Sequence, residues 1–219
     1  MNEPLRLVCC ASGGGRTILN LLDHIEAGTL AATIECVVLS RTMLPAAERC
    51  RARGLRVHEP PSHVDIDDWV VSRIAATSPE LVCLCGYLRL LPIEPWMRHR
   101  VINIHPALLP AFGGRGMHGQ RVHEAVLASG NATTGCTVHF VDDEYDHGPT
   151  ILQRSCEVVS DDTPTTLAAR VFQEECLAMP EAIRLLVEGR VRAGAGGTTD
   201  IADEGAPWPD AAVHSEKSC

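Results

Sequence analysis

The sequence predicts an α/β protein built on a mostly parallel sheet. From residue 5 to about residue 192, short apolar runs of strand length alternate with segments whose apolar residues recur at helical spacing. Strands that alternate with helices in this way pair in parallel through right-handed crossovers. A chain of 219 residues is long enough for one such domain and a tail. We therefore expect one folded domain over residues 1–192 and a mobile C-terminal tail over residues 193–219.

The elements follow in a regular order. Two features modify the simple alternation: an acidic turn at residues 142–149, which makes the last two strands antiparallel, and Pro180, which interrupts the final helical pattern. The expected strands cover residues 5–10, 33–40, 55–58, 80–86, 101–105, 134–141 and 151–159. The expected helices cover residues 18–25, 44–53, 65–77, 120–128 and 163–191.

Composition excludes several classes of protein. The net charge of -9 argues against a nucleic-acid partner, because phosphate binding needs clustered Lys and Arg. No segment reaches the roughly 18 apolar residues of a membrane span, and the first residues lack the basic region of a signal peptide. Most of the ten cysteines lie in apolar strand-like runs, which is typical of a reduced cytoplasmic protein. Cys83 and Cys85 have no second pair at zinc spacing, so we expect no metal.

A glycine-rich turn joins the first strand to the first helix. Its sequence is Gly13-Gly14-Gly15-Arg16-Thr17. Glycines let backbone N–H groups approach an anion, and a helix N-terminus adds favourable potential, so the turn is a candidate phosphate site. It lacks the Gly-Lys-Ser/Thr of a P-loop and the third glycine of a dinucleotide site. The alternative is a plain tight turn.

The most informative stretch is the strand at residues 101–105. Asn103 and His105 are two residues apart, so both side chains lie on the same face of the strand. Pro106 ends the strand, and in an open α/β sheet ligands bind at such carboxyl ends. The alternative is that the two side chains only satisfy the backbone of nearby loops. Their pairing and the downstream sequence favour a functional site.

Asp146 follows the sixth strand and is placed to approach His105. A neighbouring carboxylate is expected to raise the pKa of the imidazole, so that protonated His105 and the Asn103 amide together stabilise an oxyanion. The same His and Asp can transfer protons. No Ser or Cys lies in a nucleophile-elbow sequence. We therefore expect direct transfer to a nucleophile that belongs to the substrate.

These motifs resemble the phosphoribosylglycinamide formyltransferase family. The resemblance rests on Asn-Ile-His-Pro-Ala-Leu-Leu-Pro at 103–110, on Gly-Cys-Thr-Val-His-Phe-Val at 135–141 and on Asp-His-Gly-Pro at 146–149, and it covers about residues 5–192. It implies a Rossmann-like fold with a mixed, mostly parallel seven-stranded sheet and helices on both faces. It also implies formyl transfer from 10-formyltetrahydrofolate, used as a co-substrate, to glycinamide ribonucleotide, by a monomer or homodimer.

The resemblance assigns roles to particular residues. It implies a catalytic trio, a phosphate loop, a carboxylate beside the glycinamide group and a loop that lines the folate site. The family often has Asn-Gly-Ser-Asn where this chain has Gly14-Gly15-Arg16-Thr17, so the side-chain contacts of this loop are not carried over. The implied catalytic trio is Asn103, His105 and Asp146. The implied phosphate loop is Gly15, Arg16 and Thr17, and the implied carboxylate is Glu175. The implied folate loop is Leu88, Arg89, Leu90 and Leu91, with Asn103 also at the folate site.

Two alternatives differ in function. One is another formyltetrahydrofolate-dependent transferase or hydrolase; the roughly 27 residues after Arg192 are too few for the C-terminal domain of a methionyl-tRNA formyltransferase, and the first strand begins too early for the N-terminal domain of a deformylase. The other is a nucleotide-binding module without catalysis, in which His105 and Asp146 would be incidental. A formyl-transfer assay separates these possibilities.

Overall fold

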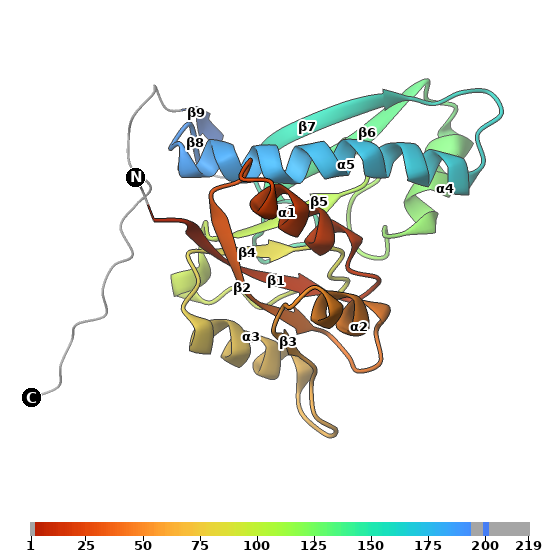
Figure 1. The fold of residues 1–219 in the computed structure, drawn as a ribbon. Helices are drawn as coiled ribbons and strands as arrows, with labels where there is room; N and C mark the ends of the chain where they lie inside the picture. Colours follow the sequence, from red (N-terminus) through yellow and green to blue (C-terminus); the bar gives the residue numbers. More distant parts are fainter. Residues whose placement is uncertain (1–2, 194–198, 202–219) are drawn as a thin grey trace, which may run out of the picture.

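The computed structural model describes residues 3–193 and 199–201 and is centred on a seven-stranded sheet (Figure 1). The strand order is β3-β2-β1-β4-β5-β6-β7. Only β6 runs against the others, because both of its pairings are antiparallel and every other pairing in the sheet is parallel. The expected mixed, mostly parallel sheet is confirmed. The strands are β1 (Leu5–Ala11), β2 (Ala32–Leu39), β3 (Val57–His58), β4 (Leu81–Leu84), β5 (Val101–His105), β6 (Thr133–Phe140) and β7 (Thr150–Glu157).

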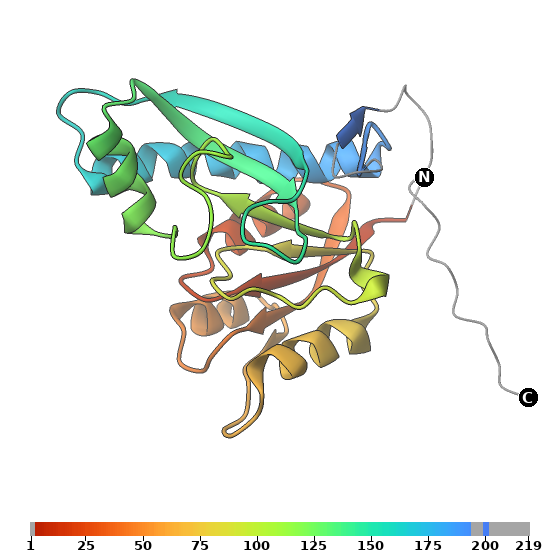
Figure 2. The ribbon, with the colours of Figure 1, turned by 180° about the vertical axis from the view of Figure 1, so that it is seen from behind.

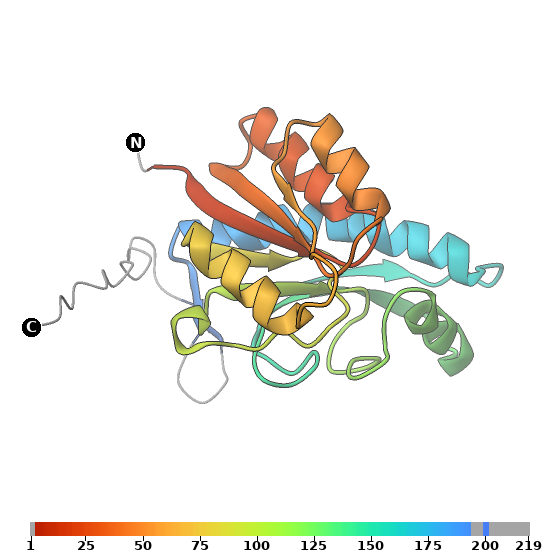
Figure 3. The same cartoon turned by 90° about the horizontal axis from the view of Figure 1, so that it is seen from below.

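Helices cover both faces of the sheet (Figure 3). The helices α1 (Arg16–Glu26), α2 (Pro45–Ala52) and α5 (Pro164–Val187) contribute to one core. The helix α3 (Ile66–Thr77) and the short 3-10 helix η1 (Pro95–Met97) contribute to the core on the other face. The helix α4 (Gln120–Ser129) lies beside the N-terminal half of α5 (Figure 2). None of the helices in the described ranges is long and apolar enough to cross a membrane.

The central strand β1 shows why the sheet is buried on both sides. Leu7 and Cys9 belong to the core under α1 and α5, whereas Val8 and Cys10 belong to the core under α3. All four side chains are fully buried. A parallel strand covered on both faces needs such a continuous apolar run, and here cysteine serves as a small apolar side chain. The cysteines that the structure describes are all free thiols.

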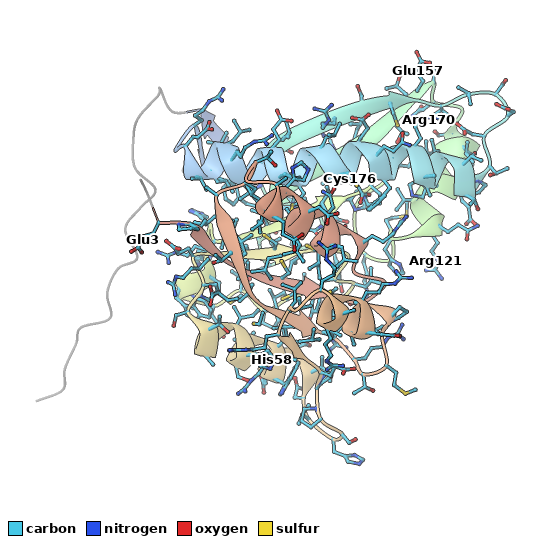
Figure 4. The ribbon with its side chains drawn as sticks, viewed as in Figure 1. Glu3, His58, Arg121, Glu157, Arg170 and Cys176 are labelled. Atoms are coloured by element: carbon cyan, nitrogen blue, oxygen red, sulfur yellow. The ribbon has the colours of Figure 1, made fainter. Side chains whose placement is uncertain are left out.

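The final helix continues through Pro180, so the predicted interruption is wrong. Proline has no N–H, and within a helix it leaves the carbonyl four residues earlier without its usual donor. That carbonyl belongs to Cys176, and the Asn20 side chain of α1 donates to it at 2.8 Å. Cys176 is labelled in Figure 4, on the part of α5 that lies next to α1. A tertiary hydrogen bond therefore replaces the missing helical one.

The C-terminal boundary also differs from the expectation. The helix α5 ends at Val187 rather than near residue 191, and Gly189 follows at a φ of 66°. Strand β8 (Val191–Ala193) pairs antiparallel with β9 (Thr199–Ile201) in a separate two-stranded sheet. Part of the predicted tail is therefore paired backbone, and the rest of residues 193–219 lies outside the described residues.

The strand order places a ligand crevice between β1 and β4. From β1 the chain proceeds outward to β2 and β3, and it then returns to β4 on the other side of β1. The loops that follow β1 and β4 therefore diverge to opposite faces of the sheet and leave a crevice at the carboxyl ends of these strands. The glycine-rich turn follows β1, and His105 ends β5, the strand next to β4. The fold alone brings the two candidate sites to the same edge.

Candidate active site

The glycine-rich turn has the geometry of an anion cradle. Gly15 is the N-cap of α1 and has a φ of 73°, a conformation that favours glycine. A Cβ added there would lie 3.0 Å from the Ala46 Cβ of α2, so the loop is packed too closely for a side chain. No side chain caps α1, and Leu19 is the residue whose N–H bonds back to the Gly15 carbonyl. The N–H groups of the first helical turn before Leu19 have no helical acceptor and can bind an anion.

Two guanidinium groups flank this turn. Arg49 of α2 donates through Nη1 to the Gly14 carbonyl at 3.1 Å. The guanidinium carbon of Arg16 lies 3.9 Å from the centre of the Phe172 ring of α5. Within the ranges that the structure describes, neither arginine forms an ion pair with a carboxylate. The turn is therefore a local cationic site on a chain of net charge -9.

The Asn103 amide is oriented by the antiparallel partner strand. Asn103 of β5 lies opposite His139 of β6. The Nδ1 atom of His139 lies 2.7 Å from the carbonyl oxygen of Phe140, which can only accept, so the ring proton is on Nδ1. The Nε2 atom of His139 is then an acceptor, and the Asn103 Nδ2 donates to it at 3.1 Å. His139 is a site residue that our sequence analysis did not single out, although it lies in the Gly-Cys-Thr-Val-His-Phe-Val motif.

Asp146 reaches this pair because its turn packs tightly on β6. A Cβ on Gly148 would lie 2.0 Å from the Phe140 carbonyl oxygen, so only glycine allows this approach. Asp146 itself has a φ of 55°, a left-handed conformation that is uncommon outside glycine but more frequent for Asp. Its Oδ2 lies 3.3 Å from the Nδ1 of His105, and its Oδ1 lies 3.4 Å from the Nδ2 of Asn103. The structure thus brings the three predicted catalytic residues together.

The loop between β5 and α4 closes over the trio. The Nε2 of His105 donates to the Phe112 carbonyl at 2.8 Å. The Gly114 N–H donates to the Oδ2 of Asp146 at 2.9 Å. Phe112 has a φ of 58°, which turns its carbonyl in an unusual direction for a non-glycine residue. These backbone contacts could not be predicted from the sequence, because carbonyl and N–H groups carry no residue-specific signal.

The protonation states differ from the expectation in one respect. Burial alone would raise the pKa of Asp146, but His139, His105 and the Gly114 N–H together lower this pKa below its ordinary value, so Asp146 is ionised. Burial lowers the pKa of His105, and the attraction of Asp146 and the Phe112 carbonyl does not overcome it. The predicted increase in the pKa of His105 is therefore wrong. At pH 7 the ring is mainly neutral, with its proton on Nε2 and its Nδ1 lone pair facing Asp146.

One cavity of about 690 Å³ joins the phosphate cradle to this trio. Its wall includes Gly15, Arg16 and Thr17 at one end and Asn103, His105 and Asp146 at the other. Glu175 of α5 also lines it. Burial raises the pKa of Glu175 to about 7, while the positive charge of Arg16 acts in the opposite direction. All of the predicted substrate-binding residues therefore meet in a single cavity.

The side chains of the predicted folate loop point in different directions. Leu88 lines the cavity and is 45% exposed. Arg89 instead forms a bidentate ion pair with Asp67 of α3, at 2.7 and 2.9 Å, and the Leu90 N–H donates to the Tyr145 hydroxyl at 3.0 Å. Leu91 is buried in the core under α3. Of the four predicted residues, only Leu88 reaches the cavity wall.

Metal ligands are not gathered at this site. In the part of the chain that the structure describes, no group of three or more His, Cys, Asp or Glu side chains is arranged to hold a metal ion. Transfer without a metal stays a prediction.

Comparison with known proteins places these observations in a family. The family model described as "Formyl transferase" matches residues 5–183. A chloroplastic phosphoribosylglycinamide formyltransferase of Arabidopsis thaliana is 35% identical over 202 residues, which are 87% of this chain and 69% of that protein. The phosphoribosylglycinamide formyltransferase of Escherichia coli is 30% identical over 86% of this chain and 90% of its own length.

The human trifunctional purine biosynthetic protein adenosine-3 is 32% identical, and the match covers 20% of that longer protein. Among solved structures, glycinamide ribonucleotide transformylase 1 of Symbiobacterium toebii superposes with a TM-score of 0.81 at 34% identity. The match covers 93% of this chain and 96% of that one. The chain belongs to the formyl transferase family, and its predicted resemblance to the phosphoribosylglycinamide formyltransferases is confirmed.

Proposed function

We propose that this protein transfers a formyl group from 10-formyltetrahydrofolate to the amine of glycinamide ribonucleotide, a step of purine biosynthesis. The observation that carries the proposal is the single cavity that has a phosphate cradle at one end and the Asn103, His105 and Asp146 trio at the other. A phosphorylated amine can reach the trio from the cradle within that cavity. The named activities of the relatives support the same assignment.

The cavity suggests where each substrate lies. The ribonucleotide phosphate binds the N–H groups that begin α1, with Gly15, Arg16 and Thr17 around it. Glu175 then lies beside the glycinamide portion. The folate enters past Leu88, so that its formyl group meets the ribonucleotide amine at Asn103 and His105. Arg89, Leu90 and Leu91 support the folate side by holding the loop in place.

The trio provides donors for the developing charge. The amine attacks the formyl carbon, a C–N bond forms, and the formyl oxygen becomes negatively charged. One hydrogen of the Asn103 amide is held by His139 at 3.1 Å, and this fixes the direction of the other. That second hydrogen makes only a long contact of 3.4 Å with Asp146, so it is available to the formyl oxygen. The Nε2–H of His105 is the second donor, and it must be released or shared by the Phe112 carbonyl.

Asp146 and His105 together accept and return the proton of the amine. Neutral His105 has a lone pair at Nδ1 that faces the Asp146 carboxylate at 3.3 Å. The proton that leaves the amine, directly or through water, is shared between these two atoms. When the bond from the formyl carbon to N10 of the folate breaks, the same proton can be returned to N10. Atoms and charges then balance, with a formamide and tetrahydrofolate as products.

The decisive experiment supplies both substrates to the purified protein. We expect tetrahydrofolate and formylated glycinamide ribonucleotide to appear in equal amounts. Formate in place of the formylated ribonucleotide would identify a hydrolase, and ribonucleotide binding without turnover would identify a non-catalytic module. The oligomeric state, monomer or homodimer, and the cytoplasmic location stay predictions that gel filtration and localisation experiments test.

A further inference from the structure

One group of residues in the cavity has a relationship that the transfer chemistry does not use. Arg16 begins α1 at the glycine-rich turn, and its guanidinium carbon lies 3.9 Å from the centre of the Phe172 ring. Glu175 follows Phe172 by three residues on α5, so the two side chains lie on the same face of that helix. All three line the same cavity.

The contact with Phe172 stabilises the position of Arg16 only weakly. In the described ranges no carboxylate lies within ion-pair distance of this guanidinium, which lies over the face of the Phe172 ring. An exposed cation–π contact is weak. A phosphate dianion offers bidentate, charge-assisted hydrogen bonds, which are stronger. A phosphate bound at the start of α1 will therefore draw Arg16 away from the ring.

Glu175 is sensitive to the position of Arg16. Its pKa of about 7 is a balance between burial, which raises it, and the charge of Arg16, which lowers it. The other titratable and charged groups near Glu175 do little to offset a change in the position of Arg16. Burial raises the pKa of the Cys136 thiol of β6 to about 12 and also raises that of Cys176, so both thiols are neutral. Arg154 of β7 is already paired with Glu174 and Glu181, and His123 of α4, also on the cavity wall, has a lowered pKa and is neutral.

We propose that Arg16 couples phosphate binding to the protonation of Glu175: the phosphate takes Arg16 from Phe172, and Glu175 then accepts a proton. The inference rests on the proposed function only in placing a phosphate at the glycine-rich turn. Moving a cation away and adding a dianion both favour the neutral carboxylic acid. In a complex with a phosphate that carries no amine, the proton comes from solvent.

The coupling has a consequence for the proposed reaction. A carboxylate beside the glycinamide amine stabilises the ammonium form, which has no lone pair and cannot attack the formyl carbon. A neutral Glu175 does not stabilise the ammonium form in this way, and it can still donate a hydrogen bond. The phosphate at one end of the cavity thus favours the reactive form of the amine at the other end. A glycinamide riboside without the phosphate should bind with Glu175 ionised and react slowly.

Isothermal titration calorimetry with ribose 5-phosphate tests the coupling in the full-length protein. Titrations at pH 7 in buffers of different ionisation enthalpy give the number of protons taken up on binding. We expect uptake of up to about half a proton, since a group with a pKa of about 7 is about half ionised at this pH. Affinity should fall as the pH rises from about 7, by up to about tenfold for each unit by which binding raises the pKa of Glu175.

Three variants and one control separate the contributions. Glu175→Gln should abolish the uptake by Glu175. Any proton taken up or released by the phosphate itself persists in this variant and is subtracted. Arg16→Met should weaken binding and reduce the Glu175 component, because without Arg16 more of Glu175 is already protonated in the free protein. Phe172→Leu should release Arg16 and raise the pKa of Glu175 in the free protein, which a carboxyl ¹³C NMR titration measures. Arg49→Met removes the other guanidinium at the turn, so it should weaken binding while the proton uptake persists.

The outcomes are distinct. Equal proton uptake in the wild type and Glu175→Gln would overturn the proposal, as would full uptake in Arg16→Met. Failure of ribose 5-phosphate to bind would show that the phosphate site is elsewhere and would overturn it too. A protein that shows the coupling but does not formylate glycinamide ribonucleotide would refute the proposed function and leave the coupling in place.

Discussion

The Asn103 amide nitrogen lies 3.1 Å from the Nε2 of His139, directly across the antiparallel pair of β5 and β6. In the neutral ring, His139 uses its Nδ1–H on the Phe140 carbonyl, so its Nε2 is an acceptor. Asn103 then turns its nitrogen, and not its oxygen, toward β6. The orientation of one proposed catalytic side chain thus depends on a buried neighbour that takes no part in the bond changes.

The first prediction concerns this positioning role. His139→Leu removes the acceptor for Asn103 and leaves buried polar groups unpaired, so it should cost about 1–3 kcal/mol of stability and reduce kcat more than either KM. His139→Gln places an amide oxygen near the position of Nε2 and should recover part of the kcat. Steady-state kinetics and denaturant unfolding measure both effects. Equal kcat values in the two variants would argue against an orienting role.

The second prediction concerns the dependence of His105 on Asp146. Asp146→Asn preserves the shape but removes the charge, so it should lower kcat by roughly a hundred- to a thousandfold and leave both KM values nearly unchanged, because the lost interaction belongs to the transition state. The double variant with His105→Ala should be little worse than His105→Ala alone, since groups that act as a unit are not additive. A double variant that loses the full product of both effects would show that the residues act independently.

The third prediction is the direction of the pH profile. The pKa of His105 lies below its ordinary value of 6.5, and the pKa of Asp146 lies below 3.8. If neutral His105 accepts the proton, kcat/KM should rise with pH through a pKa below 6.5 and level off near neutrality. Because Asp146 raises the pKa of His105, Asp146→Asn should move this limb to still lower pH. A kcat/KM that instead falls with rising pH in this range would show that protonated His105 is the active form.

The fourth prediction tests the phosphate cradle with an added charge. Gly13 has open space for a Cβ, whereas Gly15 does not, so Gly13→Asp introduces a carboxylate without a steric clash. Repulsion should weaken ribonucleotide binding by about tenfold or more and leave folate binding nearly unchanged. Gly13→Asn is the matched neutral control and should change little. Equal losses for both ligands would place the phosphate elsewhere.

Gly15→Asp should in addition destabilise the protein, because Gly15 has a positive φ and an added Cβ would contact Ala46.

The fifth prediction concerns the predicted C-terminal tail. Residues 202–219 contain Pro207 and Pro209 and no periodic apolar pattern. Deleting residues 202–219 keeps β9 and its pairing with β8 and should leave kcat and both KM values nearly intact. A truncated protein with a normal melting temperature but no activity would show that this segment contributes to the site.

The predictability of the site differs among its residues. Asn103 and His105 were predicted because a strand period of two and a terminal proline fix their direction without any tertiary information. Asp146 was predicted from its motif. In the structure, the close packing of Gly148 against Phe140 brings Asp146 to His105 and Asn103. The prediction that residues 88–91 contact the folate stays untested. Of their side chains, that of Leu88 lies at the cavity wall, whereas Arg89 pairs with Asp67 and Leu91 is buried in the core.

Periodicity, glycine and proline act locally along the chain. They were therefore enough to predict the succession of strands and helices along the sequence, the antiparallel return of β7 on β6 and the glycine-rich turn. Three further features depend on the tertiary structure. Asn20 of α1 supplies the donor that is missing at Pro180 by bonding to the Cys176 carbonyl. Burial rather than Asp146 sets the direction of the pKa of His105, and Arg16 lies on Phe172 in the cavity that Glu175 also lines. Each of these depends on groups distant in the sequence, whose distances and burial arise only when the helices close on the sheet.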